Sequence, residues 1–154
     1  MVWCFAPGLS DLPQALRWLW VAQLPKIRVV LADDHRGFLE AVQSNIGSEV
    51  EIVRCVDNGE SLVEAAMKLH PDVIVTDISM PRLSGIGAVD RLRDSGCLSK
   101  VVFLTAHSDP DFVSAGLNTG ALAYVLKSSM ATDLLFAIQE AFAGRVFVSC
   151  QEWG

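Results

Sequence analysis

The chain alternates between short, almost wholly apolar runs and longer segments in which apolar residues recur every three or four positions. The short runs are typical of strands buried on both faces, and the longer spacing is typical of amphipathic helices. Strands are predicted over 27–32, 51–56, 72–76, 101–104 and 123–126. A helix is predicted after each strand, over about 38–46, 57–69, 89–96, 109–120 and 129–143. This alternation predicts a single α/β domain with a five-stranded parallel sheet and helices on both faces.

Cap and stop residues mark the ends of these helices. Asp57 with Glu60 three residues later predicts a capping box at the second helix. Asp109 followed by Pro110 predicts a cap with proline in the first turn of the fourth helix. The residues expected to end helices are Gly47, Gly96, Gly120 and Gly144.

The composition changes near Pro25, and the segment before it is unusually apolar. It holds three tryptophans, and its only charged residues are Asp11 and Arg17. Its apolar residues recur at helical spacing and predict a helix over about 13–24, with a stripe made of Leu12, Ala15, Leu16, Leu19 and Ala22. We therefore divide the chain into an extension (1–25), one folded domain (26–148) and a tail (149–154). Residues 1–25 have four possible roles: they pack on the domain, mediate dimerisation, contact a membrane surface, or form a loosely ordered extension.

Length, composition and charge narrow the class of protein. The 154 residues suffice for one domain, and 51% hydrophobic residues allow a substantial core. A net charge of −6 argues against direct nucleic-acid binding, and no apolar run reaches the roughly 20 residues of a membrane span. The four scattered cysteines match no zinc site or disulfide framework; they are Cys4, Cys55, Cys97 and Cys150. Free thiols and a cytoplasmic location are expected.

The residues that end the predicted strands carry the chemistry. Asp33 and Asp34 follow the first strand, and Asp77 follows the third. Thr105 ends the fourth strand and Lys127 follows the fifth. Because ligands bind beyond the carboxyl ends of the strands in open parallel sheets, these side chains are expected to converge. Clustered carboxylates favour a hard cation, and Mg²⁺ fits best; helix capping alone would explain neither the lysine nor the threonine.

Four segments in this order resemble the receiver domain of two-component response regulators. They are VVLADDH at 29–35, VIVTDISMP at 73–81 with Ser84-Gly85, FLTA at 103–106, and Gly120-Ala121 with Tyr124 and Lys127. The resemblance covers about residues 26–148 and implies a doubly wound, flavodoxin-like sheet with strand order 2-1-3-4-5. This order is taken from the resemblance, because a member of the same family is itself a standard example of it.

The resemblance implies phosphoryl transfer with Mg²⁺ as cofactor. Asp77 would accept a phosphoryl group from the phosphohistidine of a histidine kinase or phosphotransfer protein. Asp33, Asp34, Asp77 and the main-chain carbonyl of Ser79 would bind the metal ion. Lys127 and Thr105 would contact phosphoryl oxygens. The chain would then catalyse its own phosphorylation and dephosphorylation without being a turnover enzyme.

The resemblance also implies how the signal leaves the site. Thr105 and Tyr124 would act as the switch pair, and their movement would alter the surface of residues 109–143, which would bind a downstream protein; a homodimer also fits. Ser79 and His107 occupy positions that tune how fast water removes the phosphoryl group. We therefore expect His107 to alter the phosphoryl lifetime.

A serine follows Lys127 where many receivers have a proline, which leaves the conformation of the Lys127–Ser128 bond open. This junction and AGRVFVS at 143–149 resemble the receivers of the helix-turn-helix (LuxR/NarL-type) subfamily, but no DNA-binding domain follows in these residues. A stand-alone switch and a truncated transcription regulator both fit. A second alternative is an interaction module with this fold that acts without phosphorylation. An Asp-x-Asp phosphohydrolase is disfavoured because Ser79 replaces its general acid.

Overall fold

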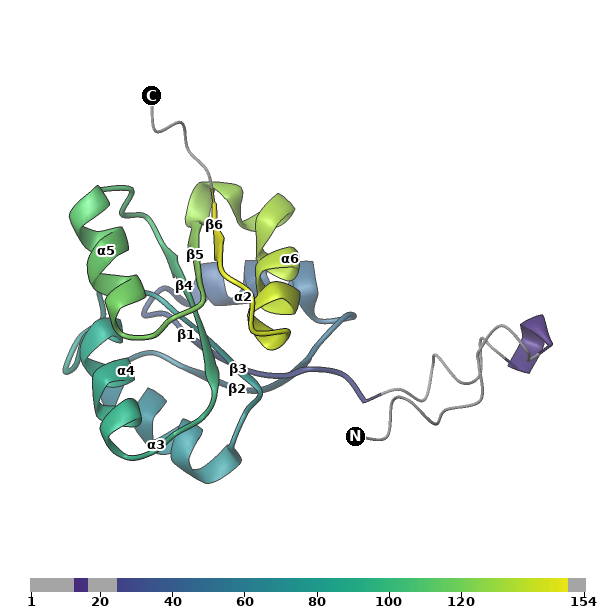
Figure 1. Ribbon diagram of the computed structural model, residues 1–154, viewed down its shortest axis with the longest axis horizontal. Coiled ribbons are helices and arrows are strands. Elements are labelled where there is room, and N and C mark those ends of the chain that lie inside the picture. Colours follow the sequence, from purple (N-terminus) through teal and green to yellow (C-terminus); the bar gives the residue numbers. More distant parts are fainter. Residues whose placement is uncertain (1–12, 17–24, 150–154) are drawn as a thin grey trace.

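The computed structural model describes residues 13–16 and 25–149, and strands and helices alternate along the second of these ranges (Figure 1). The strands are β1 (Arg28–Ala32), β2 (Glu51–Val56), β3 (Val73–Thr76), β4 (Lys100–Thr105), β5 (Ala123–Leu126) and β6 (Phe147–Val148). The helices are α2 (Arg36–Ile46), α3 (Gly59–Leu69), α4 (Gly85–Asp94), α5 (Pro110–Asn118) and α6 (Met130–Phe142), with a short 3-10 helix, η3 (Lys127–Ser129), before α6.

The strands form one parallel sheet in the order β2-β1-β3-β4-β5-β6. The predicted order of the first five strands is confirmed, but the predicted number of five is wrong for the described residues. After Gly144, which has a φ of 82°, the chain turns back and Phe147 pairs with Ala123 beside β5. A strand of two residues is too short to leave a periodic pattern in the sequence.

Helices cover both faces of the sheet, with α2 and α6 on one side and α3, α4 and α5 on the other (Figure 1). Each face has its own apolar core. On the first face, Ile46 and Ile138 are fully buried against strand residues such as Val29. On the second face, Leu62 and Leu92 are buried against the other side of the same strands. Burial on both faces explains why the strands read as continuous apolar runs.

Most predicted helix ends are confirmed, with corrections at the starts of α3 and α4. Helix α4 begins at Gly85, four residues before the predicted start, and Ser84 caps it. The side chain of Asp109 caps α5 by accepting a hydrogen bond from the N–H of Asp111 over 2.8 Å, with proline in the first turn. At α3 the cap is Asn58, whose Oδ1 accepts from the N–H of Ser61 over 2.8 Å. The predicted capping box at Asp57 is therefore one residue out of register. The Asp57 carboxylate instead accepts a hydrogen bond from the Asn58 amide.

The apolar extension and the cysteines are described only in part. Pro13–Leu16 form one helical turn, in which the N–H of Leu16 donates to the Pro13 carbonyl over 2.9 Å. The remainder of the predicted helix over 13–24 lies outside the described residues, as do two cysteines (4 and 150) and residues 150–154. Cys55 and Cys97 are free thiols. None of the helices in the described part of the chain is long and apolar enough to span a membrane.

Candidate functional site

Two central strands bring three carboxylates to the carboxyl end of the sheet. β1 ends at Ala32 and is followed by Asp33 and Asp34. β3 ends at Thr76 and is followed by Asp77. Ala32 pairs with Thr76, and the N–H of Asp77 donates to the Ala32 carbonyl over 3.0 Å. The register of the two neighbouring strands therefore brings Asp33 and Asp77 together, as predicted.

Lys127 holds two of these carboxylates from the end of β5. Its Nζ lies 2.6 Å from Oδ2 of Asp33 and 3.0 Å from Oδ2 of Asp77. The exposed fractions of these three side chains are 18%, 4% and 7%. Burial lowers the pKa of Lys127, but hydrogen bonds and charge interactions with the two aspartates outweigh it and leave the pKa raised. The lysine is therefore a fixed positive charge in the site.

Sequence reasoning missed the side chain that supports this lysine. The ring centroid of Phe38 in α2 lies 4.6 Å from the Lys127 Nζ, at cation–π distance. Helical spacing assigned Phe38 to the core, and no local signal links it to a residue 89 positions later. The peptide bond between Lys127 and Ser128 is trans, since no cis bond occurs in the described residues.

Asp34 is the most exposed of the three carboxylates. Its side chain is 35% exposed, and its Oδ1 lies 3.1 Å from Nδ1 of His35. The same His35 nitrogen lies 3.2 Å from Oδ1 of Asp33, and candidate ligand atoms of the three residues fall within 4.8 Å of one another. His35 is the N-cap residue of α2. Three carboxylates, of which Lys127 bridges two, leave an excess of negative charge that suits a hard divalent cation.

The loop after β3 is shaped by close backbone packing. The Oδ1 of Asp77 accepts a hydrogen bond from the N–H of Ile78 over 2.7 Å, so one carboxylate oxygen faces Lys127 and the other faces the main chain. The N–H of Gly85 donates to the Ile78 carbonyl over 2.7 Å. A Cβ atom at Gly85 would overlap the Asp77 carbonyl oxygen, so only glycine fits there.

The residues at the ends of β4 and β5 form a connected group. Thr105 is fully buried, and its Oγ1 accepts a hydrogen bond from the N–H of His107 over 3.3 Å. Tyr124 is 1% exposed and donates from its hydroxyl to the His107 carbonyl over 2.6 Å. Burial, with smaller contributions from Asp77 and Asp109, raises the pKa of Tyr124 to about 12. The phenol therefore remains protonated and can keep donating this hydrogen bond at neutral pH.

The imidazole of His107 connects two loops at this end of the sheet. Its Nε2 lies 3.0 Å from Oγ of Ser79, two residues after Asp77. Its ring stacks on Phe112 in the first turn of α5, with centroids 4.5 Å apart and planes 22° apart. The sequence placed Ser79 and His107 at the site but did not predict their contact. Phe112 was missed, because only the folded loop shows which ring it meets.

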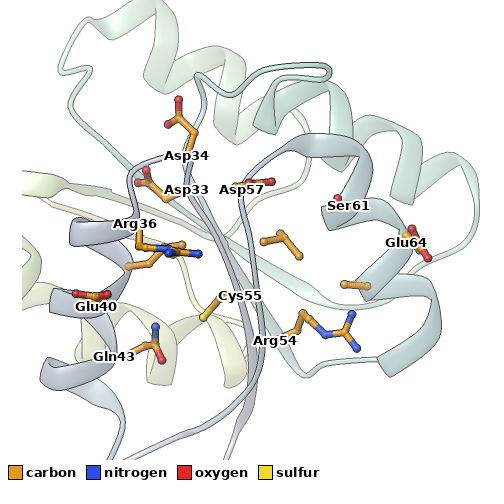
Figure 2. A pocket seen from close by; sticks show the side chains of 13 residues that line it. Asp33, Asp34, Arg36, Glu40, Gln43, Arg54, Cys55, Asp57, Ser61 and Glu64 are labelled. Carbon is orange, nitrogen blue, oxygen red and sulfur yellow. The ribbon is translucent and has the colours of Figure 1, made fainter.

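Two hollows open beside the acid pair. A groove of about 500 Å³ runs from Asp33 and Asp34 along the edge strand β2. Figure 2 shows its walls, formed by Arg36, Glu40 and Gln43 of α2, Arg54 and Cys55 of β2, and Ser61 and Glu64 of α3. A shallower and more apolar hollow on the other side of Asp34 is lined by residues 78–81 and Phe112. The acid cluster is therefore reachable from solvent on two sides.

Comparison with known proteins agrees with this geometry. The family model described as "Response regulator receiver domain" matches residues 29–139. The chain belongs to this family. The receiver is 36% identical over 124 residues to the uncharacterized transcriptional regulatory protein YvfU of Bacillus subtilis, covering 79% of this chain and 62% of that protein. It is 31% identical over 123 residues to the nitrate/nitrite response regulator protein NarL of Escherichia coli, covering 79% of this chain and 57% of that protein.

Solved receiver domains share the fold. The signal receiver domain of NarL from Mycobacterium tuberculosis superposes with a TM-score of 0.76 at 31% identity, covering 79% of this chain and all of that one. The isolated receiver domain of RcsB from Salmonella enterica, solved with a phosphomimetic, superposes with a TM-score of 0.73 at 26% identity. The match covers 80% of this chain and 93% of that one. The chain spans 53–62% of the length of the first curated relatives it matches. The receiver is thus a signalling module of the LuxR/NarL-type response regulators, a family that binds Mg²⁺ at an acidic pocket.

Proposed function

We propose that Asp77 of this receiver accepts a phosphoryl group from the phosphohistidine of a histidine kinase or phosphotransfer protein. A carboxylate oxygen of Asp77 forms a bond to phosphorus while the bond from phosphorus to the imidazole nitrogen breaks, and that nitrogen keeps the electron pair. The observation that supports this most is the position of Asp77. It lies between Lys127 at 3.0 Å and the main chain of its own loop, beside two further carboxylates.

The donor set at this end of the sheet suits Mg²⁺. Asp33, Asp34, Asp77 and the carbonyl of Ser79 would hold the ion, and all of them follow the ends of β1 and β3. When bound, the ion neutralises negative charge on the transferring phosphoryl group. The protein's own residues do the remaining work. Lys127 offers a fixed ammonium to one phosphoryl oxygen, and Thr105 offers a hydroxyl to another.

Incubation with a small phosphodonor tests the proposal directly. With Mg²⁺ and acetyl phosphate, intact mass spectrometry should show one added phosphoryl group per chain, and chelation of the metal ion should prevent it. A protein that stays unmodified would contradict a phosphorylation switch. That result would favour a receiver-fold interaction module that acts without phosphorylation.

Mg²⁺ is expected to raise the melting temperature of the receiver. A ligand that binds only the folded acid cluster stabilises by about 1.4 kcal/mol at ten times its Kd, or a few degrees for a chain of this size. Differential scanning fluorimetry in EDTA and in increasing Mg²⁺ measures the shift. Asp34→Asn is the matched variant, because Asp34 is 35% exposed and outside the lysine bridge. An equal shift in both proteins would place the ion elsewhere.

Replacing His107 by alanine is expected to shorten the life of the phosphoryl group. The change removes the hydrogen bond to Ser79 and the stack on Phe112, which together hold a ring beside the acceptor loop. Loss of one such bond corresponds to roughly 2- to 10-fold faster hydrolysis. Decay of phosphorylated protein after donor removal measures the rate. His70→Ala is the control, because His70 caps the C-terminal end of α3, away from the acid cluster. Equal decay rates in the parent, His107→Ala and His70→Ala would discard the role of His107.

We propose that the signal leaves through residues 109–143, where a downstream protein or a second receiver would bind. The support is the contact chain from the acceptor loop to α5. Ser79 meets His107, whose ring stacks on Phe112 and whose carbonyl accepts from Tyr124. Thr105 accepts a hydrogen bond from the His107 N–H. A phosphoryl group that draws Thr105 toward it would therefore disturb the turn at His107 and the contacts that His107 makes. Such a group shifts the population toward the state it contacts better.

A further inference from the structure

An open groove lies at the amino ends of the strands, opposite the acid cluster. Its walls are the end of α3, the loops 70–72 and 95–99 that lead into β3 and β4, the first residue of β4 and the last residue of α6. We call this the basal groove. It encloses about 490 Å³. No residue of the phosphorylation site lines it, so the proposed function leaves it unexplained.

The basal groove carries large exposed apolar side chains. Leu98 is 88% exposed, Phe142 is 49% exposed and Met67 is 40% exposed. They come from three separate elements and gather around one hollow. An apolar patch of this kind, rimmed by polar residues such as Lys100, is typical of a surface that another segment covers.

The N-terminal extension enters the domain beside this groove. The N–H of Arg28, the first residue of β1, donates to Oδ2 of Asp72 over 2.9 Å. Its guanidinium Nη1 donates to the carbonyls of Leu69 and His70 over 2.8 and 3.1 Å. His70 and Asp72 both line the groove. Three hydrogen bonds thus anchor the start of β1 to the groove wall, and only residues 25–27 separate it from the apolar helix predicted from the sequence.

The extension has an apolar surface of matching chemistry. Its predicted helix presents an apolar stripe, and Arg17 is the only charged residue between positions 13 and 24. The structure describes two residues of this stripe, Ala15 and Leu16; both are exposed, and Leu16 is 47% exposed. A short linker therefore joins the apolar stripe predicted for the extension to the exposed apolar side chains of the basal groove.

We propose that residues 13–24 bind as a helix in the basal groove of the same chain. Twelve helical residues span about 18 Å, and three linker residues reach about 10 Å, which brings the stripe to Leu98 and Met67 without unravelling β1. Binding of an apolar helix face in an apolar groove is a common recognition mode. The short linker makes this an intramolecular contact with a high effective concentration, which favours it over a second copy.

The tryptophans make this contact measurable. All four lie outside residues 25–149; they are Trp3, Trp18, Trp20 and Trp153. A full-length Trp153→Phe protein therefore reports only on the extension. If the helix is bound, its tryptophan emission should lie at shorter wavelength than in urea, and acrylamide should quench it less.

The decisive variant is Leu98→Asp in the Trp153→Phe background. Leu98 is 88% exposed, so the substitution leaves the core intact while placing a charge in the groove. Emission should shift toward the unfolded value and quenching should rise. Phe112→Asp is the matched control: Phe112 is 39% exposed but lies at the opposite end of the sheet, and this variant should keep the emission of the parent.

Three outcomes would overturn the proposal. Emission unchanged by Leu98→Asp, with the fold intact by circular dichroism, would show that the groove is not the site. Emission that depends on protein concentration would assign the groove to the extension of a second copy. A shift to shorter wavelength that occurs only with phospholipid vesicles would assign the extension to a membrane surface. None of these measurements depends on phosphorylation of Asp77, so a negative result here would leave the proposed function untouched, and the reverse also holds.

Discussion

Replacing Asp77 by asparagine is expected to abolish phosphorylation by acetyl phosphate. Asp77 is buried, and its carboxylate lies between Lys127 and the acceptor loop. An amide is a far poorer nucleophile than a carboxylate, so the rate should fall by at least ~10²-fold. Intact mass spectrometry after timed incubation with Mg²⁺ and the donor measures the incorporation.

The asparagine should leave the fold intact. Its amide oxygen can still accept from the Ile78 N–H, as Oδ1 of Asp77 does over 2.7 Å. Asp90→Asn is the matched control, because Asp90 is an exposed residue of α4. This control should be phosphorylated like the parent. Full incorporation into Asp77→Asn would show that another side chain is the acceptor, and peptide mapping would then identify it.

Replacing Lys127 by methionine should have the second largest effect, on both rate and stability. Methionine keeps an unbranched apolar stem beside Phe38 but removes the ammonium that bridges Asp33 and Asp77. The loss of a fixed charge at the developing transition state should slow phosphorylation roughly 10²-fold. In EDTA, two buried carboxylates lose their partner, which should cost roughly 1–3 kcal/mol of unfolding free energy.

The metal ion should restore part of that stability. Because a cation is then missing from the cluster, Mg²⁺ should raise the melting temperature of Lys127→Met more than that of the parent. Lys68→Met is the control: Lys68 pairs with Glu64 at 2.8 Å, but both side chains are more than 60% exposed. Such pairs contribute little, so its stability should hardly change. A phosphorylation rate unaffected by Lys127→Met would remove the lysine from the mechanism.

The sequence predicted much of the site because its key residues follow strands. In a parallel sheet the carboxyl ends of all strands lie on one edge, so knowing where β1, β3 and β5 end was enough to expect Asp33, Asp77 and Lys127 together. The contacts that support them were not predictable. Phe38 contacts Lys127 and Phe112 contacts His107, and each contact joins residues from different elements, so the local sequence pattern does not say which partner either ring meets.

The sequence predicted the structure least well where an element is very short or where neighbouring residues could each cap the same helix. The strand Phe147–Val148 has only two residues, and neighbouring polar residues at the start of α3 could each have capped it. The cap at Asn58 depends on where the helix meets its neighbours. A Cβ at Gly59 would overlap the carbonyl of Leu83, so close packing against the loop before α4 accompanies the start of the helix there. Such packing has no signature in local sequence.

Periodicity and the residues at strand ends are local properties, so the class of fold and the members of the acid cluster could be predicted from the amino-acid order alone, and the strand order from the family resemblance. The contact partners of those residues, and the surfaces that stay exposed, became known only from the folded chain. The His107 bond to Ser79 spans 28 residues, and the basal groove joins α3, two loops and α6. These depend on how helices pack over a common sheet, which is set by contacts between distant segments and not by any one of them.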